Sequence, residues 1–269
     1  MDESFRARYG PWALVAGGSM GMGAAYARQL AQRGFNLVLV AEAAEPLETL
    51  AGSLAAEYRV ETRPLVVDLG AAAMLEAVEG ATRDLEIGLL VYNAAHSVVG
   101  RFLDVSLDDK LQMLNVNCRG PLILCHHYGT RMAARRRGAI IVVASLSGFQ
   151  GHAMVGTYAA TKAFDLVLGE ALWAELREHG IDVLAFCPGA TRTPAFLATQ
   201  PRPTGAVSPP LMDPEETVAE ALAALGRQPT RIAGRSNRLA AFVLHRLLPR
   251  RALIELMSRT TSAMYDRRS

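Results

Sequence analysis

The sequence predicts an α/β fold, with a doubly wound parallel sheet, helices on both faces and a single domain over residues 1–269. One observation behind this prediction is that short apolar runs alternate with helical patterns along the chain. Another is the glycine-rich turn after the first apolar run. A third is that small or polar residues follow several of the runs, where parallel strands would bring them to one edge of the sheet.

The apolar runs have the length and composition of buried parallel strands. They cover residues 12–17, 36–41, 61–68, 87–92, 138–145 and 181–187, with a possible edge strand at 230–233. Helical patterns separate and follow them, at residues 24–34, 46–58, 71–84, 108–132, 157–179, 213–226 and 239–248, with a last helix after residue 251.

Composition is consistent with one large core, because 51% of the 269 residues are hydrophobic. The apolar runs are far shorter than the roughly 18–20 residues of a membrane span. The N-terminal residues pass from charges directly into a strand and lack a signal-peptide pattern. The three cysteines form no CxxC motif, which predicts thiols in a reducing cytoplasm; no metal site is expected.

The turn after the first strand reads GGSMGMG, with glycines at 17, 21 and 23. Such a turn lets the backbone approach a pyrophosphate at the helix N-terminus. Glu42, at the exit of the second strand, lies near the offset at which an acidic group accepts hydrogen bonds from an adenosine ribose. Met20 is not basic either, so both positions favour NAD over NADP. The alternative is that Glu42 only begins a solvated helix.

Residues 145–162 carry the groups that could perform chemistry. Tyr158 and Lys162 are four apart and share one face of a helix. An ammonium near a phenol favours the phenolate and lowers a pKa that is ordinarily about 10. Ser145 follows a strand and could bond the same substrate oxygen. The alternative for the Tyr/Lys pair alone is an exposed pair at helical spacing.

Three further positions lie at strand ends or within a helix. Asp68 ends the third strand, where it could contact an adenine ring or cap the next helix. Asn93-Ala94-Ala95 begins a loop of small residues after the fourth strand. Asn117 lies in an otherwise apolar helix, where a buried amide either satisfies a neighbouring loop or perturbs the helix to hold a water.

Together these motifs resemble the short-chain dehydrogenase/reductase family over roughly residues 10–195. The matching elements, in chain order, are GGSMGMG, Asp68, Asn93-Ala94-Ala95, Asn117, Ser145, YAATK and PGATRT. The sequence departs from the family pattern at Ala16, Tyr92 and Ala95, all in turns. The resemblance implies a Rossmann-type fold and an NAD(P)-dependent oxidoreductase that interconverts a secondary alcohol and a ketone.

The resemblance also implies a role for each matching residue. Tyr158 would be the acid/base, and Lys162 would lower the pKa of Tyr158 and bond the nicotinamide ribose. Ser145 would polarise the substrate oxygen, and Asn117 would hold a water that links Lys162 to solvent. The remaining cofactor contacts would be Gly17, Ser19, Met20, Gly21 and Gly23 at the pyrophosphate, Glu42 at the adenosine ribose, Asp68 and Leu69 at the adenine, Asn93 with Ala94 at the adjoining ribose, and Pro188, Gly189 and Thr193 at the nicotinamide.

The substrate is predicted to be hydrophobic, such as a sterol-like or acyl-chain-like alcohol or ketone, because the candidate pocket walls are mostly apolar. These walls are Leu146, Phe149, His152, Met154 and residues 196–212. His96 and His152 could assist catalysis, although a histidine in a loop is more often a bystander.

The C-terminal part has a different character. Residues 194–226 are expected to form a substrate lid, and residues 235–269 a basic helical extension. From residue 227 onward ten arginines oppose two acidic residues, so this part carries +8 and the rest −6. Residues 239–248 are expected to pack on the core or a sister subunit, with weak docking on an anionic membrane as the alternative. No nucleic acid is expected to bind.

Two expectations complete the prediction. A homodimer or homotetramer is implied by the resemblance, through the helices that hold Asn117 and Tyr158. The alternative function is a dinucleotide-sensing protein without turnover. The complete set of Asn117, Ser145, Tyr158 and Lys162 argues against it, because a sensor has no use for a proton relay.

Overall fold

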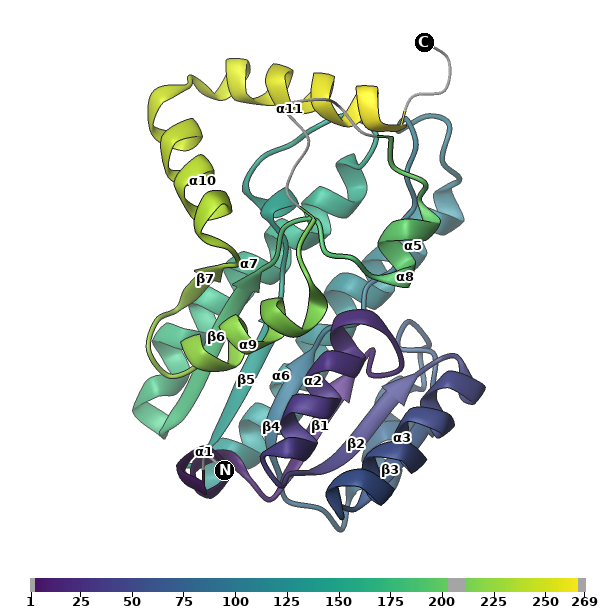
Figure 1. Ribbon diagram of the computed structural model, residues 1–269, viewed down its shortest axis with the longest axis vertical. Coiled ribbons are helices and arrows are strands. Elements are labelled where there is room, and N and C mark those ends of the chain that lie inside the picture. The colour runs from purple at the N-terminus through teal and green to yellow at the C-terminus, as the bar shows by residue number, and fades with distance from the viewer. Residues whose placement is uncertain (1–2, 203–210, 266–269) are drawn as a thin grey trace.

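The protein, as a computed structural model, is described over residues 3–202 and 211–265. Its strands form one parallel sheet in the order β3-β2-β1-β4-β5-β6-β7 (Figure 1). They are β1 (Trp12–Ala16), β2 (Asn36–Ala41), β3 (Thr62–Val66), β4 (Ile87–Tyr92), β5 (Gly138–Val143), β6 (Ile181–Cys187) and β7 (Thr230–Ile232). Strand order reverses between β1 and β4, so this is the topological switch point at which ligands of doubly wound sheets bind. The predicted fold class is confirmed.

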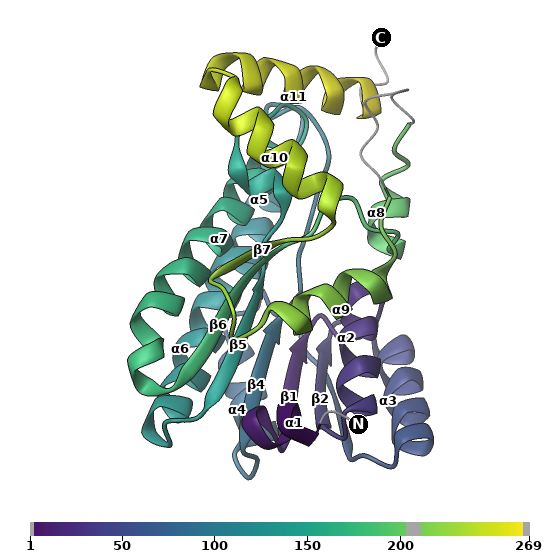
Figure 2. The same cartoon turned by 60° about the vertical axis from the view of Figure 1, so that its left-hand side comes forward.

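Helices cover both faces of the sheet (Figure 2). One face carries α2 (Gly21–Gln32), α3 (Ala44–Tyr58) and α9 (Pro214–Ala224). The opposite face carries α4 (Met74–Thr82), α6 (Gly120–Ala134) and α7 (Gly156–Leu176). Every residue of β4 and β5 is buried, because a central parallel strand has helices on both sides. This explains why the central strands are continuous apolar runs.

A helix precedes β1 where we expected charged residues leading directly into the strand. This α1 (Glu3–Tyr9) places Phe5 and Tyr9 on one face, with ring centres 4.9 Å apart. Phe5 also meets the ring of Phe35 at 5.9 Å, and the Tyr9 hydroxyl donates to Asp182 at 2.6 Å. The aromatic contact with Phe35 and the Tyr9 hydrogen bond therefore outweigh the charged composition of this segment.

The helix predicted over residues 108–132 is continuous but not uniform. It consists of α5 (Leu107–Leu114), a π-helical segment (Asn115–Arg119) and α6. The hydroxyl of Tyr92, at the end of β4, donates to the Val116 carbonyl at 2.5 Å within the π segment. Tyr92 therefore pairs with a carbonyl in the irregular turn. The expectation that the departures from the family pattern all lie in turns is wrong for two of them, because Ala16 is the last residue of β1 and Tyr92 the last residue of β4.

The C-terminal helices lie at the sheet edge where the strands end (Figures 1 and 2). After the short α8 (Pro194–Ala198) and β7 come α10 (Arg235–Leu247) and α11 (Arg250–Tyr265). Of the lid expected over residues 194–226, α9 belongs to the core, because its Val218, Ala221 and Leu222 are buried. Residues 203–210 of that segment lie outside the described residues.

Two further properties belong to the described residues. None of their helices is both long and apolar enough to cross a membrane. Cys118, Cys125 and Cys187 are free thiols, the first half-buried and the others buried.

Candidate active site

The Tyr158 and Lys162 side chains lie together at the start of α7, as the four-residue spacing predicts. The Lys162 Nζ is 5.9 Å from the centre of the Tyr158 ring. Lys162 is buried, and its ammonium donates to the Val143 carbonyl at 2.8 Å and to the Asp165 carboxylate at 2.9 Å. Because an ammonium has three N–H donors, it can form one more hydrogen bond in this position. The surface-pair alternative is therefore wrong for Lys162.

The electrostatic surroundings keep Lys162 charged. Burial alone lowers the pKa of this ammonium, but the neighbouring Asp165 carboxylate and Tyr158 phenol reverse the effect and raise the pKa above its ordinary value. Lys162 therefore presents a positive charge to Tyr158 across the neutral pH range.

Asp165 is the one member of this cluster that the sequence analysis missed. It lies one helical turn after Lys162, is buried, and uses only one carboxylate oxygen: Oδ1 has no hydrogen-bond partner among the described residues. Burial raises the pKa of this carboxyl, against the opposing effect of Lys162. Helical spacing was the available indication that Asp165 is buried, because it lies beside Leu166 and one turn before Gly169, both on the buried face of α7.

Ser145 follows β5 at the same edge of the sheet. It is half-buried, and its hydroxyl accepts a hydrogen bond from the Ser147 N–H at 3.1 Å, which begins a short 3₁₀ helix (Leu146–Phe149). The Leu146 N–H donates to the Pro188 carbonyl at 3.0 Å. The loop that carries Ser145 is thereby tied to the residue directly after β6.

Asn117 lies fully buried in the π-helical segment. Its Oδ1 accepts from the His96 N–H at 2.7 Å, and its Nδ2 donates to the His96 carbonyl and to Thr161 Oγ1, both at 2.9 Å. The amide satisfies a neighbouring loop, which was the first of the two alternatives, and it also lies where the helix is irregular. Asn117 thus joins the loop after β4 to α7.

The glycine turn has the geometry that a bound dinucleotide requires. Gly17 and Gly21 have φ values of +78° and +55°, in the left-handed region that favours glycine. A Cβ on Gly23 would lie 1.8 Å from the Gly17 carbonyl oxygen, and one on Gly17 would lie 2.6 Å from the Ala94 Cα. Neither position has room for a side chain, so the surface of this turn at the N-terminus of α2 is formed largely by backbone, and the residues present fit a pyrophosphate there.

Asn93 adds a polar group to this surface. Its Nδ2 donates to the Gly17 carbonyl at 3.0 Å, while its buried Oδ1 has no partner in the part of the chain that is described. An unpaired buried acceptor beside the glycine turn fits a ligand with hydroxyl donors, such as a ribose. Thr193 lies across the turn, since a Cβ on Gly21 would be 2.9 Å from its side chain.

The other predicted cofactor residues lie around the same edge. Met20 is the N-cap residue of α2 and is 49% exposed, with Ser19 half-buried beside it. Glu42 is exposed directly after β2, the strand whose Val40 carbonyl accepts hydrogen bonds from the Gly17 and Gly18 N–H groups. The glycine turn and the exit of β2 are therefore neighbours.

Asp68 and Leu69 follow β3, which ends at Val66, two residues earlier than expected. The Asp68 Oδ1 accepts from the Gly70 N–H at 2.8 Å and so closes a turn; it does not cap the next helix. Leu69 is buried. After β6, Gly189 leaves no space for a side chain, because a Cβ would lie 2.6 Å from Asn237 Nδ2.

Two of the predicted pocket walls face the C-terminal helices. The Phe149 ring lies 5.6 Å from the His245 ring of α10. The His152 Nδ1 is 3.1 Å from the Thr261 hydroxyl of α11, and burial lowers the pKa of this imidazole, which is consequently neutral at pH 7. The Ala153 N–H also donates to Ser258 at 3.1 Å. The loop after Ser145 is therefore bound to the C-terminal helices.

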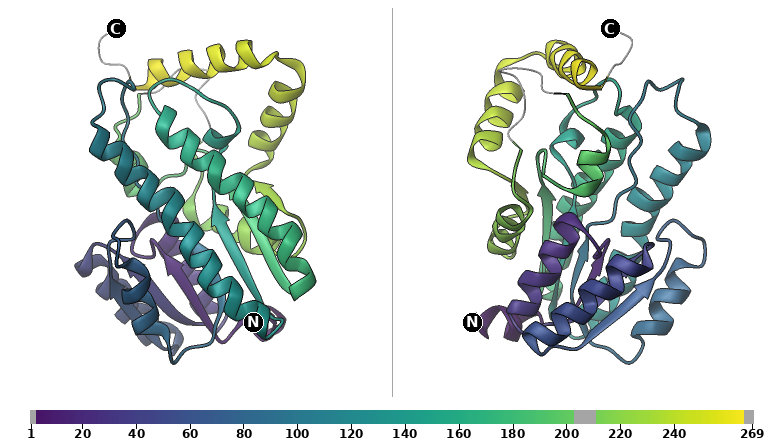
Figure 3. Two further views of the ribbon diagram at one scale, coloured as in Figure 1. Left: turned by 180° about the vertical axis from the view of Figure 1, so that it is seen from behind. Right: turned by 45° about the vertical axis from the view of Figure 1, so that its right-hand side comes forward.

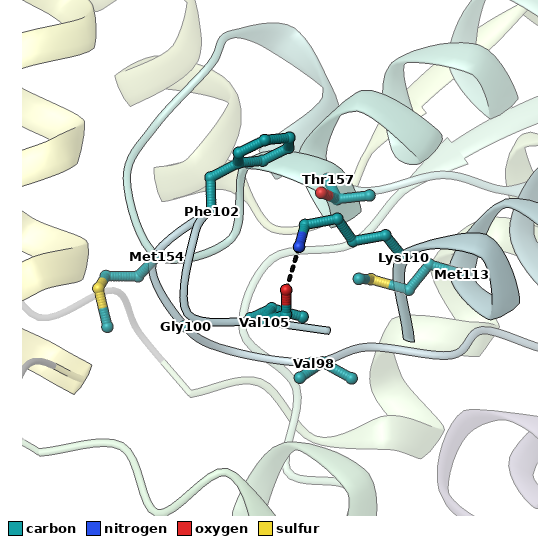
Figure 4. Close-up of a pocket in the computed structure, with 9 residues that line it drawn as sticks. Val98, Gly100, Phe102, Val105, Lys110, Met113, Met154 and Thr157 are labelled. Carbon is teal, nitrogen blue, oxygen red and sulfur yellow. Dashed lines mark hydrogen bonds between the residues drawn. The ribbon is translucent and has the colours of Figure 1, made fainter. Parts of the chain in front are cut away.

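Met154 lines a small pocket next to the start of α7 (Figure 4). Lys110 points into it and donates to the Val105 carbonyl, and Met113 closes one side. Its volume is about 20 Å³. Because a water molecule needs roughly 10–15 Å³, this pocket accommodates about one water and no sterol-sized substrate.

Comparison with known proteins identifies the family. A sequence model of the short chain dehydrogenase family matches residues 11–203. The chain belongs to this family. A 7β-hydroxysteroid dehydrogenase from Collinsella aerofaciens is 36% identical over 237 residues, which cover 87% of this chain and 90% of that protein. The chain is thus an oxidoreductase of the short-chain dehydrogenase type, as the motifs predict.

Solved structures agree with this assignment. The structure reported as giving insights into 7β-hydroxysteroid dehydrogenase stereoselectivity has a TM-score of 0.88 at 34% identity, covering 94% of this chain and 98% of that one. A short-chain dehydrogenase from Sphingobium yanoikuyae in complex with NADPH has a TM-score of 0.76 at 32% identity, covering 88% and 93%. Family members therefore include an NADPH-bound enzyme, so family membership establishes an NAD(P) cofactor and leaves the choice between them to this chain's residues.

Proposed function

We propose that this chain interconverts a secondary alcohol and a ketone on a hydrophobic, sterol-sized substrate, with NAD as the dinucleotide. When bound, NAD supplies the hydride acceptor or donor. The protein's own part is to position both molecules at the carboxyl edge of the sheet and to move the proton. The observation that carries the proposal is the buried Lys162 ammonium against the Tyr158 ring, at the same edge as the glycine turn and Ser145.

Each polar residue has a distinct task in this proposal. Tyr158 takes the proton from the alcohol during oxidation and returns it to the carbonyl oxygen during reduction. Ser145 hydrogen-bonds the same oxygen and polarises it. Lys162 favours the phenolate and uses its remaining N–H for the ribose. The Asn117 side chain is engaged by His96 and Thr161, so we place the relay water at the main-chain oxygen of Asn117.

Replacement of the phenol tests the assignment of Tyr158. Tyr158→Phe should lower kcat by about 10²–10⁴-fold, because the acid/base is lost, while NAD affinity stays within about twofold. Tyr58→Phe, on the remote α3, is the matched control and should have no effect. Unchanged turnover in Tyr158→Phe would refute the catalytic assignment, and NAD binding without any turnover in the wild type would favour the sensor alternative.

A steroid alcohol or ketone is the substrate class that we favour. The support is the similarity to 7β-hydroxysteroid dehydrogenases over nearly the whole chain. The α10 and α11 helices contact the loop after Ser145, and this position suits helices that cover a large apolar ligand. A panel of hydroxysteroids and long-chain secondary alcohols, assayed by nicotinamide absorbance, tests this choice. A preference for acyl-chain substrates over every steroid would overturn it.

NAD is proposed over NADP because of the residues near the adenosine ribose. Glu42 is exposed beside the glycine turn, and its carboxylate would repel a 2′-phosphate. Calorimetry should give tighter binding of NAD than of NADP. Glu42→Arg should shift the ratio of the two affinities toward NADP by at least about tenfold, whereas Glu45→Arg, in the first turn of α3, should shift it less. Equal or tighter NADP binding by the wild type would contradict the proposal.

A homo-oligomer is proposed through the outer face of α5, α6 and α7, which run side by side (Figure 3, left). This face exposes Leu107, Leu111, Leu114 and Leu122, with Val167 63% exposed on α7. Burial of such a stripe favours association. Light scattering should give a dimer or tetramer for the wild type and a monomer for the double variant Leu111→Glu/Leu122→Glu. A monomeric wild type would refute this interface.

The outer face of α10 is proposed to contact an anionic membrane surface. Leu239, Phe242, Val243 and Leu247 are exposed along it, so the expected packing of this run on the core does not extend to these side chains. The Arg246 guanidinium lies 5.0 Å from the Phe242 ring centre and places positive charge within the apolar stripe. Apolar side chains and arginines on one helix face suit an anionic lipid surface.

Vesicle sedimentation tests this proposal on the full chain. The wild type should sediment with phosphatidylglycerol vesicles more than with phosphatidylcholine vesicles, and the triple variant Leu239→Gln/Phe242→Gln/Leu247→Gln should remain in solution. Leu103→Gln, at an exposed leucine elsewhere, is the control. No sedimentation of the wild type would refute the proposal, and a smaller oligomer of the triple variant without lipid would make this face a subunit contact.

A cytoplasmic location is proposed from the cysteines. All three are free thiols, as expected in a reducing compartment. Cell fractionation of the tagged chain tests this location, and recovery outside the cytoplasm with oxidised thiols would contradict it.

A further inference from the structure

We propose that Asp165 is a positioning residue that fixes the Lys162 ammonium and offsets part of its charge at Tyr158. The inference rests on the proposed function, because it concerns how Lys162 acts on the phenol. It adds to the Asn117, Ser145, Tyr158 and Lys162 set a fifth polar side chain that need not touch substrate or cofactor.

The geometry places Asp165 where it controls Lys162. The Asp165 Oδ2 accepts from Nζ at 2.9 Å, and both side chains are at most 2% exposed. The Val143 carbonyl at 2.8 Å holds the ammonium from the end of β5. A side chain with four rotatable bonds is thereby fixed by two acceptors, and the third N–H is left for the phenol and ribose side.

The charge balance follows from the same geometry. A lone buried ammonium beside Tyr158 would attract a phenolate strongly, but it would also tend to lose its own proton through desolvation. A carboxylate at 2.9 Å keeps the ammonium charged and, at the same time, reduces the net field that the pair exerts on the phenol. Asp165 therefore weakens the attraction that the Lys162 ammonium alone would exert on a phenolate at Tyr158.

The other titratable groups that face the pair are neutral near pH 7, so they do not share this function. Burial raises the pKa of each of them: the Tyr92 phenol of β4, the Cys118 thiol of the π segment (to about 11), the Cys125 thiol of α6, and the Cys187 thiol of β6 (to about 12). Among the described groups that interact with the pair, Asp165 is therefore the anion that opposes Lys162.

The unpaired Oδ1 is a second sign that Asp165 is not present for stability alone. A carboxylate oxygen buried without a donor costs free energy, and an apolar residue at this position would avoid that cost. Glu170, the next carboxylate on α7, differs in this respect: it is exposed and accepts from the Thr230 hydroxyl at 2.6 Å. It serves as the matched control for removing one negative charge from the same helix.

The test is a direct titration of Tyr158 in Asp165→Asn, in the full chain labelled with ¹³Cζ-tyrosine. The Tyr158 resonance is assigned by its loss in Tyr158→Phe. We expect its midpoint to fall by about one pH unit in Asp165→Asn and to stay unchanged in Glu170→Gln. The kcat profile for alcohol oxidation should change in parallel: its acid limb moves to lower pH, and a new decline appears at alkaline pH as Lys162 loses its proton.

Each outcome decides the question. A Tyr158 titration in Asp165→Asn that superimposes on the wild type overturns the inference, even if kcat falls uniformly with pH. If Asp165→Asn does not fold, Asp165→Val removes the same charge without an orphaned polar atom and should give the same shift; an unchanged midpoint there also overturns the inference. The NMR measurement does not need turnover, so a wild type without activity would refute the proposed function and leave this test intact.

Discussion

Two carboxylates in this chain bind cations in opposite surroundings. Asp165 is buried against Lys162 with one oxygen unpaired, and burial raises the pKa of its carboxyl. Glu220 of α9 is one-fifth exposed and is bonded by the Arg231 guanidinium at 2.8 Å, the Gly234 N–H at 2.7 Å and the Arg238 guanidinium. Burial opposes ionisation of Glu220 too, but these three donors lower its pKa overall.

The difference separates an ion pair to which we assign a part in the chemistry from a cluster that stabilises the fold. Glu220 has its donors and holds β7 and the start of α10 against α9, so its ionised form supports the fold. Asp165 is under-satisfied, and a buried pair of this kind contributes little to stability although breaking it is costly. Its position beside Lys162 is better explained by control of charge than by a gain in folding free energy.

The largest expected effect comes from removing Lys162. Lys162→Met leaves Asp165 buried and unpaired, which should lower the free energy of unfolding by about 3–5 kcal/mol and abolish turnover. The double variant Lys162→Met/Asp165→Leu should recover most of the stability and none of the activity. Denaturant unfolding and a steady-state assay measure both quantities. If the free energy of unfolding of Lys162→Met lies within about 1 kcal/mol of the wild type, Asp165 tolerates the loss of its partner and the contrast with Glu220 is wrong.

Glu220→Gln should have the next largest effect. The amide keeps the shape but loses the charge that two guanidiniums bind, so we expect the free energy of unfolding to fall by about 1–3 kcal/mol. Thermal unfolding measures it, with Glu178→Gln as the control, since the Glu178 side chain is 77% exposed. If the two variants are equally stable, the Glu220 cluster is not structural.

The pH dependence of stability should distinguish Glu220 from its variant. The folded-state pKa of Glu220 lies below its ordinary value of 4.5, so its contribution is complete above that value and is lost as the pH falls through the folded-state pKa. The stability difference between wild type and Glu220→Gln should therefore be constant from neutral pH to about pH 5 and narrow below pH 4.5. A difference that does not narrow in acid would contradict the assigned ionisation.

The smallest effect is expected at a fully solvated pair. Arg251 and Glu255 are four apart on α11, at 2.8 Å, with the Arg251 side chain 91% exposed. Arg251→Ala should change the free energy of unfolding by no more than about 0.5 kcal/mol, and less at high salt. A larger loss of unfolding free energy would mean that this exposed ion pair stabilises the fold more than a solvated pair is expected to.

Much of the core could be predicted from the sequence because its physical requirements are strict. Buried parallel strands need continuous apolar runs, and β1, β2, β4, β5 and β6 lie where those runs are. The glycine turn was equally readable, since a side chain at Gly23 would collide with the Gly17 carbonyl. The four-residue spacing brought Lys162 to Tyr158 for the same geometric reason.

Features that depend on distant contacts were not predictable. The α1 helix is fixed by the contact of Phe5 with Phe35, which local charge does not reveal. The buried ion pair between Asp165 and Lys162 depends on how deeply α7 is buried. The outward direction of Leu239 and Phe242 depends on which face of α10 the loop after Ser145 occupies, and both faces of that helix are apolar.

The π-helical segment that holds Asn117 also governs the outside of the molecule. In an uninterrupted α-helix, residue 122 would be rotated by about 60° from residue 107 around the axis. A π turn contains an extra residue, so it winds the second half of the helix back and moves Leu122 from one side of Leu107 to the other, within the same row of leucines. Deleting one residue here would restore regular helical winding and leave that row nearly unchanged. The irregular turn therefore accommodates the buried Asn117 amide without interrupting the leucines on the outer surface.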